Sequence, residues 1–178
     1  MMVQLTKRSD GSVVIRCVRT DGSATWQRHQ ARQAAFFPLH DLTHFAVESE
    51  FGFRSGFYGL LANGWNMEDT SGKGARGSLP HEALAVEHFV EMLDLERACG
   101  ITWTAAELNK QAADFAAAGG RSTPSAFTDT DLERVRSRIR ALFDEWYSLM
   151  PESTLELTFA RPVVGDRPGD DRKRTIGC

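Results

Sequence analysis

The sequence has no apolar stretch near the roughly 20 residues that a membrane-spanning helix needs. Polar and charged residues recur throughout residues 1–30, so we expect no signal peptide. Cysteines are few: Cys17, Cys99 and Cys178 are scattered and form no CxxC pair. That pattern favours a reducing cytoplasm over a disulfide framework. These absences predict a cytoplasmic protein without a membrane partner.

No excess of positive charge is present either. The 178 residues carry 21 Lys and Arg against 24 Asp and Glu, a net charge of -3, and the isoelectric point is near 6.0. This balance argues against a nucleic-acid partner. With 42% hydrophobic and 25% charged residues, the composition is that of an ordinary globular protein. We expect one domain over residues 1–160 and a disordered tail at 161–178, which is rich in Arg, Asp, Gly and Pro.

Residues 2–29 predict three β-strands. Two Asp-Gly pairs, Asp10-Gly11 and Asp21-Gly22, separate β-prone runs at matched spacing, and Asp-Gly between such runs is a strong hairpin signal. Residues 155–159 alternate between apolar and polar side chains as a returning strand does. The two segments together predict a small antiparallel sheet, an N-terminal meander plus a C-terminal strand.

Helical periodicity dominates the rest of the chain. Thr102 or Thr104 is expected to cap the start of one helix, and Glu107, three residues after Thr104, would complete a capping box. The expected helices cover about 39–50, 55–62, 80–98, 104–119 and 129–149. The expected fold is therefore α+β, with the sheet packed against four or five helices.

The 129–149 helix carries an apolar stripe at 3-4-3-4-3 spacing. Its members are Leu132, Val135, Ile139, Leu142, Trp146 and Leu149. The spacing is typical of a packed helix seam. It indicates core packing, and a homodimer seam through this helix is the alternative.

The 39–50 helix carries the polar residues that point to chemistry. On a helical wheel His40, His44, Glu48 and Asp41 fall within about 100° of one another. This face has no Lys or Arg, and apolar Val47 and Phe51 lie on it. We interpret it as the wall of a pocket. The alternatives are the solvent face of an amphipathic helix and a pair of buried, hydrogen-bonding histidines.

The four residues have different expected roles at a divalent metal site, with zinc the expected ion. His40 and His44, one turn apart, would be the ligand pair through neutral imidazole nitrogens. Glu48 would be a third ligand, or it would orient His44. Asp41 or Glu48 would be the catalytic base, although Asp41 is one methylene shorter than the glutamate of an HExxH site.

The remaining ligands are expected from the 80–98 helix. Glu82 and Glu87 lie on or beside its buried stripe, whereas His81 and His88 are predicted to face solvent. The two glutamates are therefore the expected additional ligands. His29, at the end of the meander, is a further candidate.

The run from Phe37 to Glu48, followed by Gly56-Phe57-Tyr58-Gly59, resembles a family of short bacterial proteins of unknown function. The resemblance covers about residues 10–95 and implies no activity. His40, Asp41 and His44 also resemble the zinc-associated HDxxH motif of the coenzyme Q biosynthesis protein family. That family has a glutamate twelve residues after the second histidine, where this chain has Gly56.

Two functional hypotheses follow. One is a metal-dependent hydrolase acting on an unidentified small molecule, with the Gly-rich segment 63–79 as a lid. The other is a non-catalytic binding or assembly domain whose histidine pair is structural. For segment 63–79 the alternative is a mobile surface loop.

Overall fold

The computed structural model describes residues 1–74, 76–120 and 126–160. These residues form an α+β fold whose sheet contains β1 (Met2–Lys7), β2 (Val13–Val18), β3 (Ala24–His29) and β4 (Thr154–Thr158). The strand order is β3-β2-β1-β4, and each neighbouring pair is antiparallel. The predicted meander and returning strand are both confirmed.

The two Asp-Gly turns have the same construction. In the first, the Arg8 amide donates to the Ser12 carbonyl across the turn, and Asp10 accepts from the Ser12 amide. Gly11 has φ +79° and Gly22, its counterpart in the second turn, has φ +84°. Glycine is favoured at both positions because an L side chain is strained at such angles.

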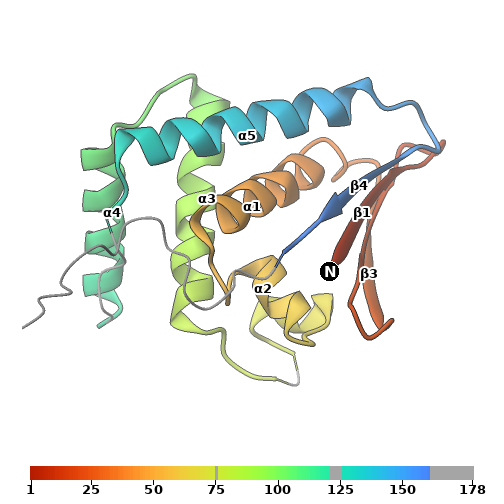
Figure 1. The fold of residues 1–178 in the computed structure, drawn as a ribbon, viewed down its shortest axis with the longest axis horizontal. Helices are drawn as coiled ribbons and strands as arrows, with labels where there is room; N and C mark the ends of the chain where they lie inside the picture. Colours follow the sequence, from red (N-terminus) through yellow and green to blue (C-terminus); the bar gives the residue numbers. More distant parts are fainter. Residues whose placement is uncertain (75, 121–125, 161–178) are drawn as a thin grey trace, which may run out of the picture.

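The described residues also form five α-helices and one short 3₁₀ helix, which lie on one side of the sheet (Figure 1). The predicted helices are all present, with ends shifted by a few residues. Segment 63–79, predicted as a loop, contains the 3₁₀ helix. The helices are α1 (Phe37–Phe51), α2 (Phe57–Ala62), η1 (Met67–Ser71), α3 (His81–Cys99), α4 (Ala105–Ala118) and α5 (Asp129–Ser148).

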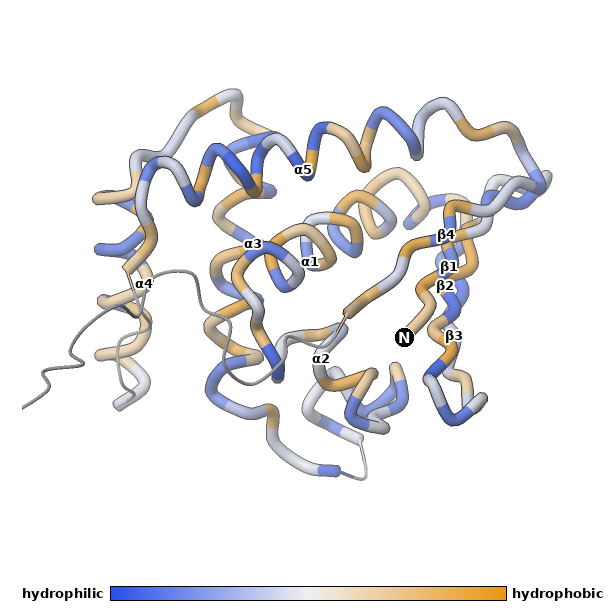
Figure 2. Tube along the Cα trace, in the orientation of Figure 1, coloured by the Kyte–Doolittle hydropathy of each residue, from blue (hydrophilic) through white to orange (hydrophobic). Residues whose placement is uncertain are grey.

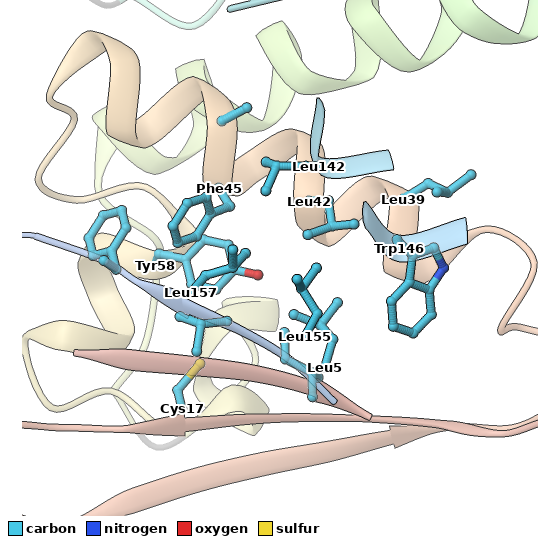
Figure 3. Close-up of a cluster of buried hydrophobic side chains, with 14 of the residues drawn as sticks. Leu5, Cys17, Leu39, Leu42, Phe45, Tyr58, Leu142, Trp146, Leu155 and Leu157 are labelled. Atoms are coloured by element: carbon cyan, nitrogen blue, oxygen red, sulfur yellow. The ribbon is translucent and has the colours of Figure 1, made fainter. Parts of the chain in front are cut away.

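Helix α1 lies at the centre of the molecule, between the sheet, α3 and α5 (Figure 1). On one side its apolar residues join the core above the sheet. Figure 3 shows Leu42 and Phe45 of α1 with Leu142 of α5 over Leu5 and Cys17 of the sheet.

A second apolar cluster lies on the other side of α1. Val47 is fully buried there with Val90 of α3, Leu108 of α4 and Val135 of α5, and Phe51 packs against the same cluster. Helix α1 is thus buried on two sides. This explains why apolar Val47 and Phe51 lie among the polar residues of the helix.

The apolar stripe of α5 faces the inside of the chain. Hydrophilic and hydrophobic stretches alternate along this helix in Figure 2. Of the stripe, Leu132, Val135, Leu142 and Trp146 are buried, and Ile139 and Leu149 pack partly buried against the core. The stripe is thus used for core packing, and a homodimer through α5 would need a different face of the helix.

Within the described residues, no helix is both long enough and apolar enough to cross a membrane. The predicted tail at 161–178 lies outside the described residues.

Candidate metal centre

The polar face of α1 is buried. Asp41, His44 and Glu48 have relative exposures of 7%, 3% and 0%, and the His40 side chain is 15% exposed. The solvent-face interpretation of this helix is therefore wrong. A buried ionisable group is costly unless partners satisfy it, so the partners of these four residues decide what they do.

His40 and His44 meet Glu87 of the neighbouring helix α3. The Nε2 atom of His44 lies 3.0 Å from one carboxylate oxygen of Glu87, and Nε2 of His40 lies 3.6 Å from the other. One ligand atom from each of the three residues can be chosen so that all lie within 4.8 Å of one another. The Glu87 side chain is 45% exposed, so this group opens to solvent.

The other ring nitrogen of His40 contacts Asp94, a residue that sequence reasoning missed. The Nδ1 to Oδ2 distance is 2.7 Å, and Asp94 also pairs with Arg97 at 3.2 Å. Asp94 follows Glu87 by seven residues, or two helical turns, so both face the same side of α3. That spacing is the signal that would have identified it.

Glu48 accepts hydrogen bonds from the first turn of α2. Its two oxygens lie 3.1 Å from the Tyr58 amide nitrogen and 2.9 Å from the Gly59 amide nitrogen. These amides have no partner inside α2, so the carboxylate caps the helix from a distant segment. A side chain at Gly56 would not fit, because its Cβ would lie 2.5 Å from Cδ of Glu48. The glutamate and the Gly56–Gly59 segment thus form one packed unit.

Two carboxylates flank His44. Glu48 lies 3.4 Å from Nδ1, at an angle that leaves Nδ1 without a hydrogen bond among the described residues, and Glu87 lies on the Nε2 side. Burial lowers the pKa of His44, but the close approach of the Glu48 and Glu87 carboxylates outweighs this effect and raises the pKa to about 9. The hydrogen bond to His44 lowers the pKa of Glu87, against the effect of burial, and the charges of His44 and His40 lower it further.

Asp41 faces away from this group. Its carboxylate contacts Nε2 of His29 at 3.2 Å, and both residues are buried. The His29 ring stacks on Phe37 with centroids 4.8 Å apart. Asp41 and His29 form a separate buried pair, so the structure does not bring the predicted base, or His29, to the three ligand atoms.

The other candidates on α3 also lie elsewhere. The Glu82 carboxylate accepts from the Ser55 amide at 2.8 Å, so it holds the segment between α1 and α2. His81 is exposed, as predicted. The prediction for His88 was wrong: its ring stacks on Phe115 of α4 with centroids 4.3 Å apart, and its Nε2 is buried. Of the two predicted glutamates, only Glu87 joins the histidines.

Segment 63–79 is hydrogen-bonded to the sheet and to the turn between β2 and β3. Arg19 of the β2–β3 turn donates to the carbonyls of Leu61 and Trp65, and the Met67 amide donates to Thr25 of β3 at 3.0 Å. None of its described contacts reaches the three ligand residues.

The three residues could hold a metal ion only if their ligand atoms moved closer together. Zinc at 2.0–2.1 Å from nitrogen or oxygen ligands would place neighbouring ligand atoms about 3.3 Å apart. The two histidine–glutamate distances, 3.0 and 3.6 Å, are close to that value but involve different oxygens of Glu87, and the ligand atoms of the group lie within 4.8 Å of one another. Two histidines and one glutamate would leave the fourth position of a tetrahedral ion open.

In comparisons with known proteins, no protein-family model, no curated protein and no solved structure matches the chain.

Proposed function

We propose that the protein binds one divalent metal ion, zinc, through Nε2 of His40, Nε2 of His44 and the carboxylate of Glu87. The observation that supports this most is the orientation of the two imidazoles. Both turn Nε2 toward Glu87, and both turn Nδ1 toward a second carboxylate, Asp94 or Glu48. Histidine ligands of metals characteristically donate their other nitrogen to a carboxylate, which fixes the ring and raises its basicity. His40 meets this condition through Asp94 at 2.7 Å. Among the described residues, Nδ1 of His44 lies 3.4 Å from Glu48 without a hydrogen bond.

Zinc suits these donors better than magnesium or calcium, which prefer oxygen ligands alone. The open fourth position and the exposed Glu87 side chain favour a hydrolytic centre over a closed structural one. In such a centre the metal lowers the pKa of a bound water to about 7 and makes it a nucleophile. Asp41 and Glu48 are engaged by His29 and by α2, so the proposed hydrolysis uses neither as its base.

One observation favours a second candidate, a structural role without metal. The raised pKa of His44 keeps this residue protonated at neutral pH in the metal-free chain. A charged His44 between Glu48 and Glu87 would join α1 to α3 by charge-assisted hydrogen bonding alone. The histidine pair would then belong to a non-catalytic domain.

Metal stoichiometry separates the two candidates. Purified protein is dialysed against zinc, its metal content is measured by elemental analysis, and its affinity is measured by competition with a chelator. We expect one zinc per chain in the wild type and a loss of affinity of roughly a hundredfold or more in His40→Ala and Glu87→Gln. His81→Ala is the matched control, because His81 is an exposed histidine of α3.

The outcomes are distinct. Substoichiometric zinc in the wild type, or an equal loss of affinity in the His81 control, contradicts the metal centre and leaves the structural candidate. Stoichiometric zinc whose removal unfolds the chain indicates a structural metal instead of a catalytic one.

A further inference from the structure

A hollow lies between α3, the segment that follows it, and α5. Its volume is about 430 Å³, within the range of pockets that hold small ligands. None of the three ligand residues lines it, and its link to the candidate metal centre is Arg97, which pairs with Asp94.

The hollow combines an apolar floor with basic walls. Leu93, Ile139 and Phe143 supply the apolar surface, and Arg97, Arg136 and Arg140 supply the charge. Two glutamates also line the hollow, so three positive charges face two negative ones. Each arginine has one carboxylate partner, since Arg97 also pairs with Asp94 at 3.2 Å.

The three arginines are engaged to different degrees. Arg136 has two hydrogen-bond partners within the protein: it donates to Glu96 at 2.7 Å and to the Trp103 carbonyl at 2.6 Å. Within the described residues, Arg97 has a single hydrogen-bond partner, Asp94, and Arg140 has only Glu133. A guanidinium carries five N–H donors. Arg97 and Arg140 therefore keep donors that an incoming anion can use.

We propose that this pocket binds a small organic anion, a carboxylate or phosphate monoester attached to an apolar body. The anionic group would be held by the guanidinium groups of Arg97 and Arg140, whose planar donors match such oxygens. The body would cover Ile139 and Phe143, and the Arg97 guanidinium already lies 6.0 Å from the Phe143 ring centroid. This proposal does not depend on the metal.

Two-dimensional NMR of the full chain tests the pocket. Phenyl phosphate and benzoate are the two anionic probes, benzyl alcohol is the neutral probe, and inorganic phosphate is the anion without a body. We expect saturable shifts, confined to the end of α3, residues 100–104 and α5, with at least one anionic probe. The neutral probe and inorganic phosphate should bind at least about tenfold more weakly.

Substitutions assign the contacts. Arg97→Gln and Arg140→Gln should each weaken binding by about tenfold, the loss expected for one charged hydrogen bond. Arg134→Gln is the control, because Arg134 is an arginine of α5 that does not line the pocket. Three results would overturn the proposal: no saturation by either anionic probe up to about 10 mM, equal binding of benzyl alcohol, or an equal loss of affinity in the control.

Discussion

In the metal-free protein, the free energy of unfolding should fall as the pH rises from 6.5 toward 9. The reason is His44, whose pKa is about 9 in the folded chain and 6.5 without its environment. Because the folded state holds this proton more tightly, the contribution is complete below pH 6.5 and is lost as the pH rises through about 9. The difference between the two pKa values corresponds to about 3 kcal/mol of stability.

Urea unfolding of chelator-treated protein at several pH values between 6.5 and 9 measures this loss. The series stops at pH 9 because the thiol of Cys17 contributes above it. Burial raises the pKa of this thiol to about 12 in the folded chain, so the thiol loses its proton at a lower pH in the unfolded chain. His44→Gln should remove the pH dependence in this window. His81→Gln, which alters an exposed histidine, should keep it.

The reasoning is refuted if the wild-type free energy of unfolding changes by less than about 1 kcal/mol across the window. It is also refuted if His44→Gln keeps the wild-type slope. Saturating zinc should reverse the trend, because metal binding requires deprotonated ligands and therefore strengthens as the pH rises.

Three further outcomes are expected. Asp94→Asn should weaken zinc binding by about 10–100-fold in the chelator competition, because it removes the carboxylate that orients His40; unchanged affinity would contradict that role. Tyr58→Phe should leave stability equal or raise it by about 1 kcal/mol in urea unfolding, since the buried hydroxyl has no hydrogen-bond partner among the described residues; a clear loss would show a missed partner. A thiol reagent followed by peptide mapping should label exposed Cys99 in the native protein and buried Cys17 only after unfolding; native labelling of Cys17 would contradict the packing of the sheet.

Local signals in the sequence were sufficient for most of the fold. The Asp-Gly turns specified both hairpins, and the Thr104 capping box marked the start of α4. These features depend on hydrogen bonds between residues that are only a few positions apart, so the sequence of the segment alone determines them. The same holds for the spacing of His40 and His44, since a helix alone places them one turn apart.

The partners of the histidines required knowledge of packing. Sequence periodicity placed Glu82 on the buried side of α3 and Glu87 on its flank, but only Glu87 lies close to the histidines of α1. Asp94 was missed because its role depends on how α3 crosses α1. The surroundings of α1 were ambiguous for a related reason: a helix buried on two sides gives the same polar wedge as an amphipathic helix at a surface.

The polar face of α1 marks the boundary between the two apolar clusters. Packing does not require charge at that position, because buried ion pairs can often be replaced by hydrophobic residues without loss of stability. Glu48 has a structural task as the cap of α2, and Asp41 pairs with His29. Neither task explains why His40 and His44 both turn Nε2 toward one partly exposed glutamate. Under the proposed function, a metal ion bound at that point would account for the arrangement; without metal, a protonated His44 between Glu48 and Glu87 would account for the His44 part of it.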